Sequence, residues 1–428
     1  MKNNIFKLQR DLTDQMKRGY FKSSIRLLFA FQFFALMLVL FYQIKEISLE
    51  SVLFAVILIL TNLIGVRLIR RLSRGDVYLL LIVNMLFSIG VIMIYRIDPY
   101  MGKRQLMIYL VSVFAYFVAF LFLRKTHSFW EGRTLFYFLL TVAFFLITLI
   151  FGFALHGAKN WIEIAGIQVQ PSEFAKIPFV FFVASWYRDY ESHQVDLWKR
   201  LSLMGGTYLL IGLFFLQREL GTAIVFLMVL ISSQIAYEVN WRLILLNIAA
   251  AGFGLLMAYF LFGHIRVRFD IWLNPWQDYN DKGYQIIQSL FAIAEGGFLG
   301  TGIGLGRPDM IPLGHSDFIF SSIIEEMGSF MGICVILLYI ILVYRGFKIV
   351  LNQAKDFYSC LALSISTMFA AQAFIMFAGV MKVIPLTGIT IPFLTYGGSS
   401  LLTSFICLAV LQVCSEDFVF QELSYEKK

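Results

Sequence analysis

The chain has 428 residues, of which 59% are hydrophobic, 17% aromatic and only 14% charged. Soluble domains carry about 25% charged residues, and their interiors cannot hold this much apolar side chain, so the composition excludes an ordinary soluble protein. The formal net charge of +8 suits a protein whose partners are the anionic membrane lipids of an inner leaflet rather than nucleic acid.

Apolar runs of about 20 residues predict an all-α polytopic integral membrane protein with about twelve transmembrane helices. A basic N-terminal arm, residues 1–24, shows no signal-peptide cleavage pattern and precedes two helices within residues 25–74. The predicted helices span 25–44, 48–67, 76–95, 105–123, 134–155, 172–188, 201–217, 220–237, 241–262, 317–344, 357–382 and 393–413. Two of them meet at Gln217 and are short, so the count is open there.

The positive-inside rule orients these helices. Clusters of Lys and Arg at 67–74, 124–133 and 345–355 share one side when the N-terminus is cytoplasmic, and the tail at 416–428 then lies on that side too. The four cysteines fall inside apolar runs without metal-like spacing, which predicts neither disulfides nor a zinc site. We therefore expect a multi-pass plasma-membrane protein with both termini in the cytoplasm.

The chemically unusual segments all fall on the opposite, outer side. They are 156–176, 217–223, the long loop 263–316 and 383–400. Positive charge is normally disfavoured on that side, yet it carries Lys159, Lys176, Arg218, Arg266, Arg268 and Lys382. Together these cations predict an electropositive outer pocket suited to a phosphate or diphosphate.

Some of the outer cations have acids beside them. Glu173 precedes Lys176 by three residues, which places both on one helical face, and Arg218 adjoins Glu219. A structural ion pair is an equally good interpretation of each of these two pairs.

Two outer segments are expected to shape the pocket. Gln170, Pro171 and Ser172 should cap the helix at 172–188, with Ser172 at its N-terminus. The segment 383–400 interrupts a helix with proline and glycine, and irregular backbone at membrane depth is tolerated only where it is buried in protein or lines a cavity. Its expected pocket-lining residues are Pro385, Gly388, Pro392, Gly397, Gly398 and Ser399.

The long loop holds two further features. Residues 284–297 have apolar positions at helical spacing, which predicts an amphipathic helix along the membrane interface, a lid or a lipid guide. The glycine-rich stretch 296–308 follows no strand and lacks the order of a dinucleotide fingerprint. Its backbone amides could cradle an anion, and a plain turn-rich loop fits equally well.

Three carboxylates mark the apolar run that follows the long loop: Asp317, Glu325 and Glu326. Unpaired charge at membrane depth is costly, so Glu325 and Glu326 are interpreted as buried partners of outer cations. Asp317 has two interpretations, either an acid with a chemical role or the ordinary N-cap of its helix.

Six motifs follow one another along the outer segments. They are GAKNWI with VQPSEFAK, QRELGTA, NPW followed by GYQIIQSL, GGFLGTGIGLG, HSDFIFSSIIEEMG and PLTGITIPFLTYGGSS. In these motifs the chain resembles the SEDS family of membrane glycosyltransferases, the RodA/FtsW/SpoVE type. The resemblance covers roughly residues 75–415 and implies a ten-helix core, so that the two helices within 25–74 are an addition. Glu219 stands where the family usually has Asp, and Lys382 where a small residue is frequent.

The resemblance implies a peptidoglycan glycosyltransferase that polymerises lipid II at the outer face of a bacterial plasma membrane. Asp317 would take the proton from the acceptor hydroxyl as this attacks the donor's anomeric carbon with inversion. The implied protein partner is a class B penicillin-binding protein. The expected substrate-binding residues, whose cations would stabilise the leaving polyprenyl diphosphate, are Lys159, Trp161, Lys176, Arg218, Glu219, Arg266, Arg268 and Lys382.

Helical spacing agrees with a single base. At about 1.5 Å rise per residue, Glu325 lies on the order of 12 Å from Asp317, too far for the carboxylate pair of a retaining glycosidase, about 5 Å apart. No cofactor is predicted, and a divalent cation between the diphosphate and a carboxylate is left open because no ligand cluster argues for it.

Two other functions stay open at this stage, a flippase for lipid-linked oligosaccharides and a non-catalytic scaffold of cell-wall synthesis. A flippase needs a matching entry site at the inner leaflet, which the sequence does not show, and a scaffold does not need Asp317. The motifs do not separate roles in elongation, division and sporulation.

Overall fold

The computed structural model describes residues 2–42, 48–155, 158–164, 166–188, 197–238, 240–279, 281 and 283–416. The structural findings below concern these residues. For Lys159 and a few other positions, chiefly residues 2–20, the description covers the backbone alone.

Within this part of the chain, nine helices are long and apolar enough to cross a membrane. They are α1 (Lys2–Tyr42), α2 (Leu49–Leu72), α3 (Tyr78–Ile97), α4 (Pro99–Lys125), α5 (Thr134–Phe151), α9 (Leu220–Tyr237), α10 (Trp241–Leu261), α13 (Ile319–Asn352) and α14 (Asp356–Val380). Three more helices match the remaining predicted segments: α6 (Pro171–Arg188), α8 (Leu197–Gln217) and α15 (Gly398–Cys414). The polytopic helical fold is therefore confirmed, and a break after Gln217 separates the two helices whose count was open.

Several boundaries differ from the predicted ones. The helix at 134–155 ends at Phe151, and α13 continues to Asn352. The last helix begins at Gly398 rather than at residue 393, because the backbone of the preceding proline- and glycine-containing segment is irregular. A positive φ of 81° at Gly328 interrupts the helical conformation of α13 two residues after Glu326.

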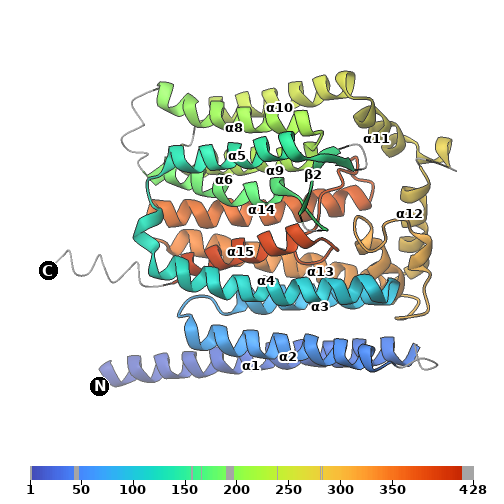
Figure 1. Ribbon diagram of the computed structural model, residues 1–428. Helices are drawn as coiled ribbons and strands as arrows, with labels where there is room; N and C mark the ends of the chain where they lie inside the picture. Colours follow the sequence, from blue (N-terminus) through green and yellow to red (C-terminus); the bar gives the residue numbers. More distant parts are fainter. Residues whose placement is uncertain are drawn as a thin grey trace.

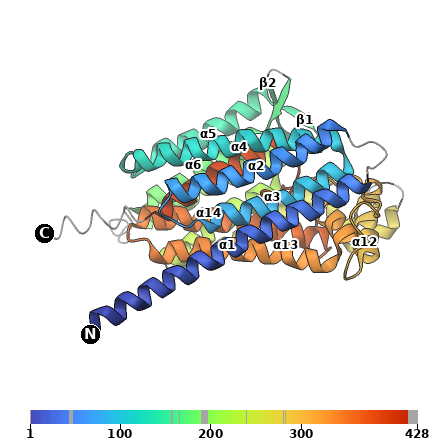
Figure 2. The same cartoon turned by 90° about the horizontal axis from the view of Figure 1, so that it is seen from below.

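A small antiparallel sheet lies between α5 and α6 and was not predicted. Its strands are β1 (Phe153–Leu155), β2 (Ala158–Ile164) and β3 (Ile167–Val169), in the order β1-β2-β3. Ile162 pairs with Val169 in the tight hairpin, and Gly166 in its turn has a φ of 79°, a conformation that glycine adopts without steric cost. The sheet projects from one end of the bundle (Figure 2).

The helices run roughly side by side, with α11 (Gly263–Leu273) and α12 (Tyr284–Gly296) at one end of the bundle (Figure 1). Figure 1 shows α12 turned across the direction of the long helices, against the beginning of α13. The amphipathic helix expected at 284–297 is thus present. The short 3₁₀ helices η3 (Pro275–Asp278) and η4 (Pro308–Met310) belong to the same end. The 3₁₀ helix η2 (His127–Trp130) lies at the opposite end, between α4 and α5.

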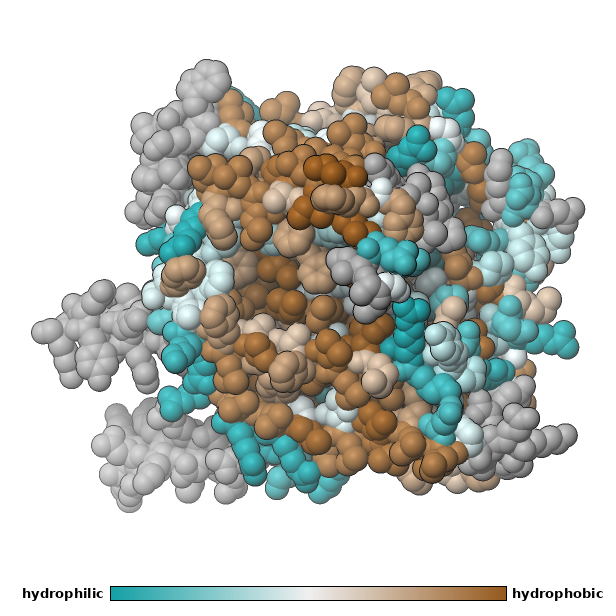
Figure 3. Space-filling model, viewed as in Figure 1, coloured by the Kyte–Doolittle hydropathy of each residue, from teal (hydrophilic) through white to brown (hydrophobic). Residues whose placement is uncertain are grey.

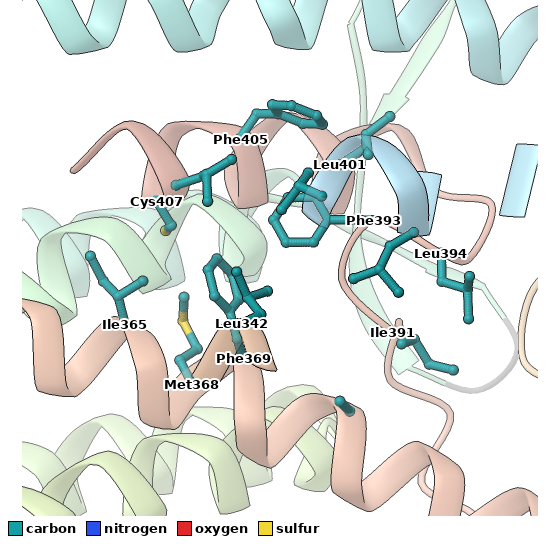
Figure 4. Close-up of a cluster of buried hydrophobic side chains, with 14 of the residues drawn as sticks. Leu342, Ile365, Met368, Phe369, Ile391, Phe393, Leu394, Leu401, Phe405 and Cys407 are labelled. Atoms are coloured by element: carbon teal, nitrogen blue, oxygen red, sulfur yellow. The ribbon is translucent and has the colours of Figure 1, made fainter. Parts of the chain in front are cut away.

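The core is centred on α3 and α14, whose apolar windows are 89% and 83% buried, whereas those of α5 and α10 are only 22% buried. The peripheral helices therefore present apolar side chains outward, and Figure 3 shows them as a broad hydrophobic face with polar residues gathered toward its margins. In the core close-up of Figure 4, the ring of Phe393 lies between Phe369 and Phe405, at centroid distances of 5.3 and 5.4 Å. The irregular segment after α14 is packed into the core by this contact.

The helices α1 and α2 form a layer against α3 (Figure 1) and are attached through buried polar side chains. Gln32 on α1 donates to the Ser88 hydroxyl at 2.7 Å, and Asn62 on α2 donates to the same oxygen at 3.3 Å. Tyr109 on α4 donates to Asn62 at 2.5 Å and to Asn84 at 3.1 Å. These hydrogen bonds fix the register of the added pair against the rest of the bundle.

Candidate active site

Asp317 lies in the turn that precedes α13, at the end of the bundle that α11 and α12 cover. Helix α13 begins at Ile319, and its N-cap residue is Phe318 rather than Asp317. The N-cap interpretation of Asp317 is therefore wrong. Its side chain is partly exposed, and a guanidinium, that of Arg268, lies nearby.

Arg268 and Asp317 approach one another across Gly388. A Cβ atom at Gly388 would stand 3.5 Å from Arg268 Nη2 and 3.6 Å from Asp317 Oδ2. Gly388 is exposed and has a φ of 71°, which side-chain-bearing residues rarely adopt. Arg268 is held in place because its Nη1 donates to the carbonyl of Thr387 at 2.6 Å. An exposed glycine thus lies beside both a carboxylate and a guanidinium.

Further positive charge surrounds this position. Burial lowers the pKa of His264, and the charges of Arg268 and Arg218 lower it further, so the imidazole is neutral at neutral pH. Desolvation also lowers the pKa of Arg268, while the Asp317 carboxylate raises it. Arg218, Arg268 and Asp317 therefore form one electrostatic group.

Two more of the predicted substrate-binding cations lie on neighbouring segments. Arg266 is exposed on α11, where its guanidinium lies 5.6 Å from the centre of the Tyr259 ring. Lys382 follows α14 with a φ of 59°, and its carbonyl accepts a hydrogen bond from Trp272 Nε1 at 3.1 Å. The latter contact ties α11 to the irregular segment after α14.

The remaining predicted contacts of this kind lie on the small sheet. Trp161 is partly exposed on β2, opposite Phe153 of β1. Lys159 also belongs to β2, but its side chain lies outside the described part of the chain. Their role in substrate binding stays a prediction.

The irregular segment 383–397 forms one wall of the site. The backbone N–H of Tyr396 donates to the His315 carbonyl at 3.1 Å, and the two rings meet edge to face at 5.7 Å. The Gly397 N–H donates to Gln105 Oε1 at 3.3 Å, and the carbonyl of the buried Pro392 accepts from the Tyr339 hydroxyl. Pro385 is partly exposed in the same wall. The segment that carries Gly388 is thereby fixed to α4, to α13 and to the turn before α13.

Glu219 connects the start of α9 to the start of α6. Its carboxylate accepts hydrogen bonds from Gln170 Nε2 at 2.9 Å, Ser172 Oγ at 3.0 Å and Thr222 Oγ1 at 2.8 Å. Burial is the main cause that raises its pKa, and the neighbouring charge of Glu173 raises it further. This network places Glu219 as a partner of the protein's own side chains.

The network corrects the expected cap of α6. The helix begins at Pro171, and the Ser172 hydroxyl points to Glu219 instead of to a free amide of its own helix. The backbone N–H of Gln170 donates to the Ser399 hydroxyl at 3.0 Å, close to Gly398 at the first position of α15. These residues therefore join α6 to α9 and α15.

Lys176 is buried, with its side chain 3% exposed, and pairs with Glu173 at 2.7 Å. The structural ion-pair interpretation is confirmed for this pair. It is not confirmed for Arg218 and Glu219, because Glu219 faces Gln170, Ser172 and Thr222 while Arg218 is exposed with a φ of 61°. Of the predicted substrate contacts, Lys176 and Glu219 thus lie in the supporting network, and Arg218 lies at the surface.

Glu326 and Arg96 form a buried ion pair with a nitrogen–oxygen distance of 3.2 Å. The Gly304 N–H also donates to Glu326 Oε2 at 3.0 Å, and Arg96 donates to the carbonyls of Gly304 and Gly306. The interpretation of Glu326 as a partner of a cation is confirmed, although Arg96 was not among the residues selected from the sequence. An arginine that ends an apolar helix was the signal that could have found it.

Glu325 has a different partner from the expected cation. Its Oε1 accepts from the backbone N–H of Arg307 at 2.5 Å, and its carbonyl accepts from the N–H of Thr301 at 2.9 Å. The amides of the glycine-rich stretch thus do cradle an anion, but the anion is a carboxylate of the same chain. Glu325 and Glu326 serve to fold 300–307 against α13.

Other residues of the site were missed from the sequence. Thr387 supplies the carbonyl that holds Arg268, and His264 lies near Arg218 and Arg268. Their contacts depend on the fold, so spacing carried no signal for them. Among the residues that the structure describes, no group of three or more His, Cys, Asp and Glu side chains is arranged to hold a metal ion.

Comparison with known proteins agrees with this architecture. The family profile FtsW/RodA/SpoVE, described as "Cell cycle protein", matches residues 76–417. The peptidoglycan glycosyltransferase RodA of Mycobacterium bovis is 33% identical over 80% of this chain and 78% of its own length. The stage V sporulation protein E of Bacillus subtilis is 32% identical over 79% of this chain and 96% of its own length.

Solved structures share the fold. A chain from a structure described as "Structural coordination of polymerization and crosslinking by a peptidoglycan synthase complex" matches with a TM-score of 0.66 and 23% identity, over 79% of this chain and 97% of that one. The rod shape determining protein RodA of Thermus thermophilus matches with a TM-score of 0.61 and 21% identity, over 81% and 98%. With its helices, motifs and outer site in this arrangement, the chain belongs to the FtsW/RodA/SpoVE family.

Proposed function

We propose that the protein is a peptidoglycan glycosyltransferase that polymerises lipid II into glycan strands. Relatives named peptidoglycan glycosyltransferase RodA and FtsW are similar over about four fifths of the chain, which supports the activity. The observation that carries the proposal for the site is the exposed Gly388, because a Cβ atom there would lie within 3.6 Å of both Asp317 and Arg268. A carboxylate and a guanidinium on either side of one exposed position can serve a hydroxyl and a diphosphate in one step.

The proposed reaction is a single displacement. Asp317 accepts the proton of the acceptor sugar's 4-hydroxyl while the hydroxyl oxygen bonds to the anomeric carbon of the donor. The bond between that carbon and the diphosphate oxygen breaks, the electron pair stays with the polyprenyl diphosphate, and the configuration inverts. Arg268 and Arg218 stabilise the charge that develops on the leaving oxygens, which fixed cations do without reorganising. Arg266 and Lys382 extend the positive surface.

Location and partner follow from the same proposal. The positive-inside rule places the Asp317 end of the bundle outside a bacterial plasma membrane and both termini in the cytoplasm. A related chain was solved in a peptidoglycan synthase complex, and we propose a class B penicillin-binding protein as partner of this chain too. A divalent cation beside the diphosphate is no part of this proposal.

The test is polymerisation of purified lipid II by the solubilised protein, comparing the wild type with Asp317→Asn. The amide has the size of the carboxylate but cannot take the proton, and loss of a general base lowers the rate by about 10²- to 10⁴-fold. Asp270→Asn, an exposed position on α11, is the matched control and should polymerise like the wild type. Thermal unfolding of all three proteins shows whether the fold is intact.

The outcomes separate the functions. Glycan strands from the wild type and from Asp270→Asn, but not from an equally stable Asp317→Asn, support the glycosyltransferase and its base. Equal product from both variants would place the base elsewhere. If the wild type makes none even with a penicillin-binding protein added, the flippase or the scaffold becomes the better function.

A further inference from the structure

A polar pocket lies at the end of the bundle opposite Asp317. It is a cavity of about 130 Å³ where the end of α13 meets the turn before α3 and the end of α15. Its polar lining residues are Asp76, Arg345, Lys348, Asn352, Gln353 and Ser415. None of them takes part in the outer site, and the positive-inside rule places this end at the cytoplasmic leaflet.

The walls of the pocket are fixed by their own contacts. Arg345 Nη1 lies 2.6 and 2.7 Å from the two carboxylate oxygens of Asp76, and its guanidinium lies 4.1 Å from the centre of the Tyr78 ring. The Asp76 N–H donates to the Ser415 hydroxyl at 3.0 Å, and Gln353 Nε2 donates to the carbonyl of a residue at the end of α15. The cavity is therefore preformed.

Two groups in this lining are left to a ligand. Lys348 is exposed and takes part in no ion pair among the described residues, so with Arg345 neutralised by Asp76 it gives the pocket one net positive charge. Gln353 Oε1 is buried and accepts no hydrogen bond. The pocket thus suits one anionic group that is bonded to a hydrogen-bond donor, and a phosphodiester attached to a hydroxyl-bearing alcohol has both parts.

The surface beside the pocket favours a lipid as the source of that phosphodiester. Counting back along α13 from Lys348 in helical steps, one stripe holds only exposed apolar side chains: Phe330, Ile333, Leu337, Ile341 and Tyr344. This stripe is long enough to contact an acyl chain along much of a leaflet, and it ends at the only unpaired cation of the lining. A free phosphate would use the pocket but gain nothing from the stripe.

We propose that this pocket is a binding site for the phosphodiester headgroup of an anionic phospholipid, with an acyl chain lying on the exposed stripe of α13. Lys348 contacts the phosphate, and Gln353 Oε1 accepts from a hydroxyl of the headgroup. Because the site joins α13, α3 and α15, a bound lipid holds together three helices that also carry the opposite end of the protein.

The experiment titrates the full-length protein in mild detergent with phosphatidylglycerol or phosphatidylcholine and counts bound lipids by native mass spectrometry. The variants are Lys348→Gln, Lys348→Arg and, as the matched control, Arg71→Gln, an exposed cation at the same end that does not line the pocket. A single lysine near anionic lipid contributes about a fivefold change in affinity. Lys348 is exposed, and thermal unfolding of each variant confirms that the fold is kept.

The proposal expects one phosphatidylglycerol to bind more tightly than phosphatidylcholine, with affinity about fivefold weaker in Lys348→Gln and unchanged in Lys348→Arg and Arg71→Gln. Equal weakening in Lys348→Gln and Arg71→Gln, or none in either, would overturn it in favour of a diffuse basic surface. Inorganic phosphate is added as a competitor in a separate arm. Displacement of the lipid by millimolar phosphate would assign the pocket to soluble phosphate and overturn the lipid part.

Discussion

At the scale of single residues, Gly388 has two separate reasons to lack a side chain. Its φ of 71° costs any other residue about 1–2 kcal/mol, and a methyl group there would enter the space that Asp317 and Arg268 share. The first effect acts on folding and the second on substrate. The two are separable, because the nearest atoms lie 3.5 Å away and the methyl group would not collide with the protein.

Gly388→Ala is therefore expected to lower kcat/KM for polymerisation by more than tenfold while lowering stability by only about 1–2 kcal/mol. The measurement pairs lipid II turnover with thermal unfolding. Gly166→Ala serves as the control, since this position has a similar φ of 79° with nothing within 4 Å of its Cβ. It should show the stability cost without the loss of turnover, and equal loss in both variants would contradict a role for the space that Asp317 and Arg268 share.

Glu219 carries the pH-dependent prediction. Its pKa is raised above the usual glutamate value of 4.5, mainly by burial, with Glu173 raising it further and Lys176 opposing the rise. A native carboxyl with a raised pKa binds more protons than the unfolded chain does, so its contribution to stability is greatest at low pH and is lost as the pH rises. The relevant window begins at about 4.5 and extends upward to the folded pKa.

The test compares the melting temperatures of the wild type and Glu219→Gln between pH 4.5 and pH 8. The difference, wild type minus variant, should fall as the pH rises, because the variant cannot ionise at this position. Glu163→Gln, an exposed carboxyl on β2, should give a difference that does not change. A difference in melting temperature that grows with pH would mean that attraction to Lys176 outweighs burial in its effect on the pKa of Glu219.

At the scale of elements, the sequence predicts what is local. Runs of apolar residues locate the long helices, because backbone hydrogen bonds must be satisfied within each span. The hairpin of β2 and β3 was missed because β3 has only three residues, too few for an alternating pattern to show. The position of Asp317 before α13 followed from its motif, but its approach to Arg268 required a turn after α14 that spacing alone cannot give.

The glycine-rich stretch 300–307 is held against α13 by Glu325 and Glu326, and a mutation can test this contact. Replacing Arg96 by Met leaves Glu326 as a buried charge without its cation, and breaking such a pair costs about 3–5 kcal/mol. Removing both charges, with Arg96→Met and Glu326→Gln, should cost less, since no charge is then left unpaired. Thermal unfolding of the two variants shows which of them loses more stability.

Hydrogen exchange gives the local readout for the same pair. In Arg96→Met the amide of Gly304, which donates to Glu326, should exchange faster than in the wild type, while amides of the β2–β3 hairpin stay unchanged. Faster exchange throughout the protein would instead indicate a general loss of stability. It would contradict a local role of the Arg96–Glu326 pair in holding residues 300–307.

At the scale of the whole molecule, the family profile begins at residue 76, and α1 and α2 lie before it as a separate layer. Their attachment is polar on the side of α3 and α4, through Asn84, Ser88 and Tyr109. Polar side chains are disfavoured on a lipid-facing surface. The surface of α3 and α4 that carries these groups is therefore suited to contact with α1 and α2. The proposed polymerisation site lies at the end of the bundle, and none of the described residues assigned to it belongs to α1 or α2.

Deletion of residues 1–70 should therefore lower stability and leave lipid II turnover at low temperature largely intact. The loss arises because Asn84, Ser88 and Tyr109 would meet lipid without partners, and buried hydrogen bonds in membrane proteins contribute about 0.6 kcal/mol each on average. The matched control is the same deletion with Asn84→Leu and Tyr109→Phe, which removes most of the exposed polar groups and should recover part of the melting temperature. If the truncated protein is stable but inactive, and the control does not differ from it, the layer acts on catalysis instead of on the packing of the bundle.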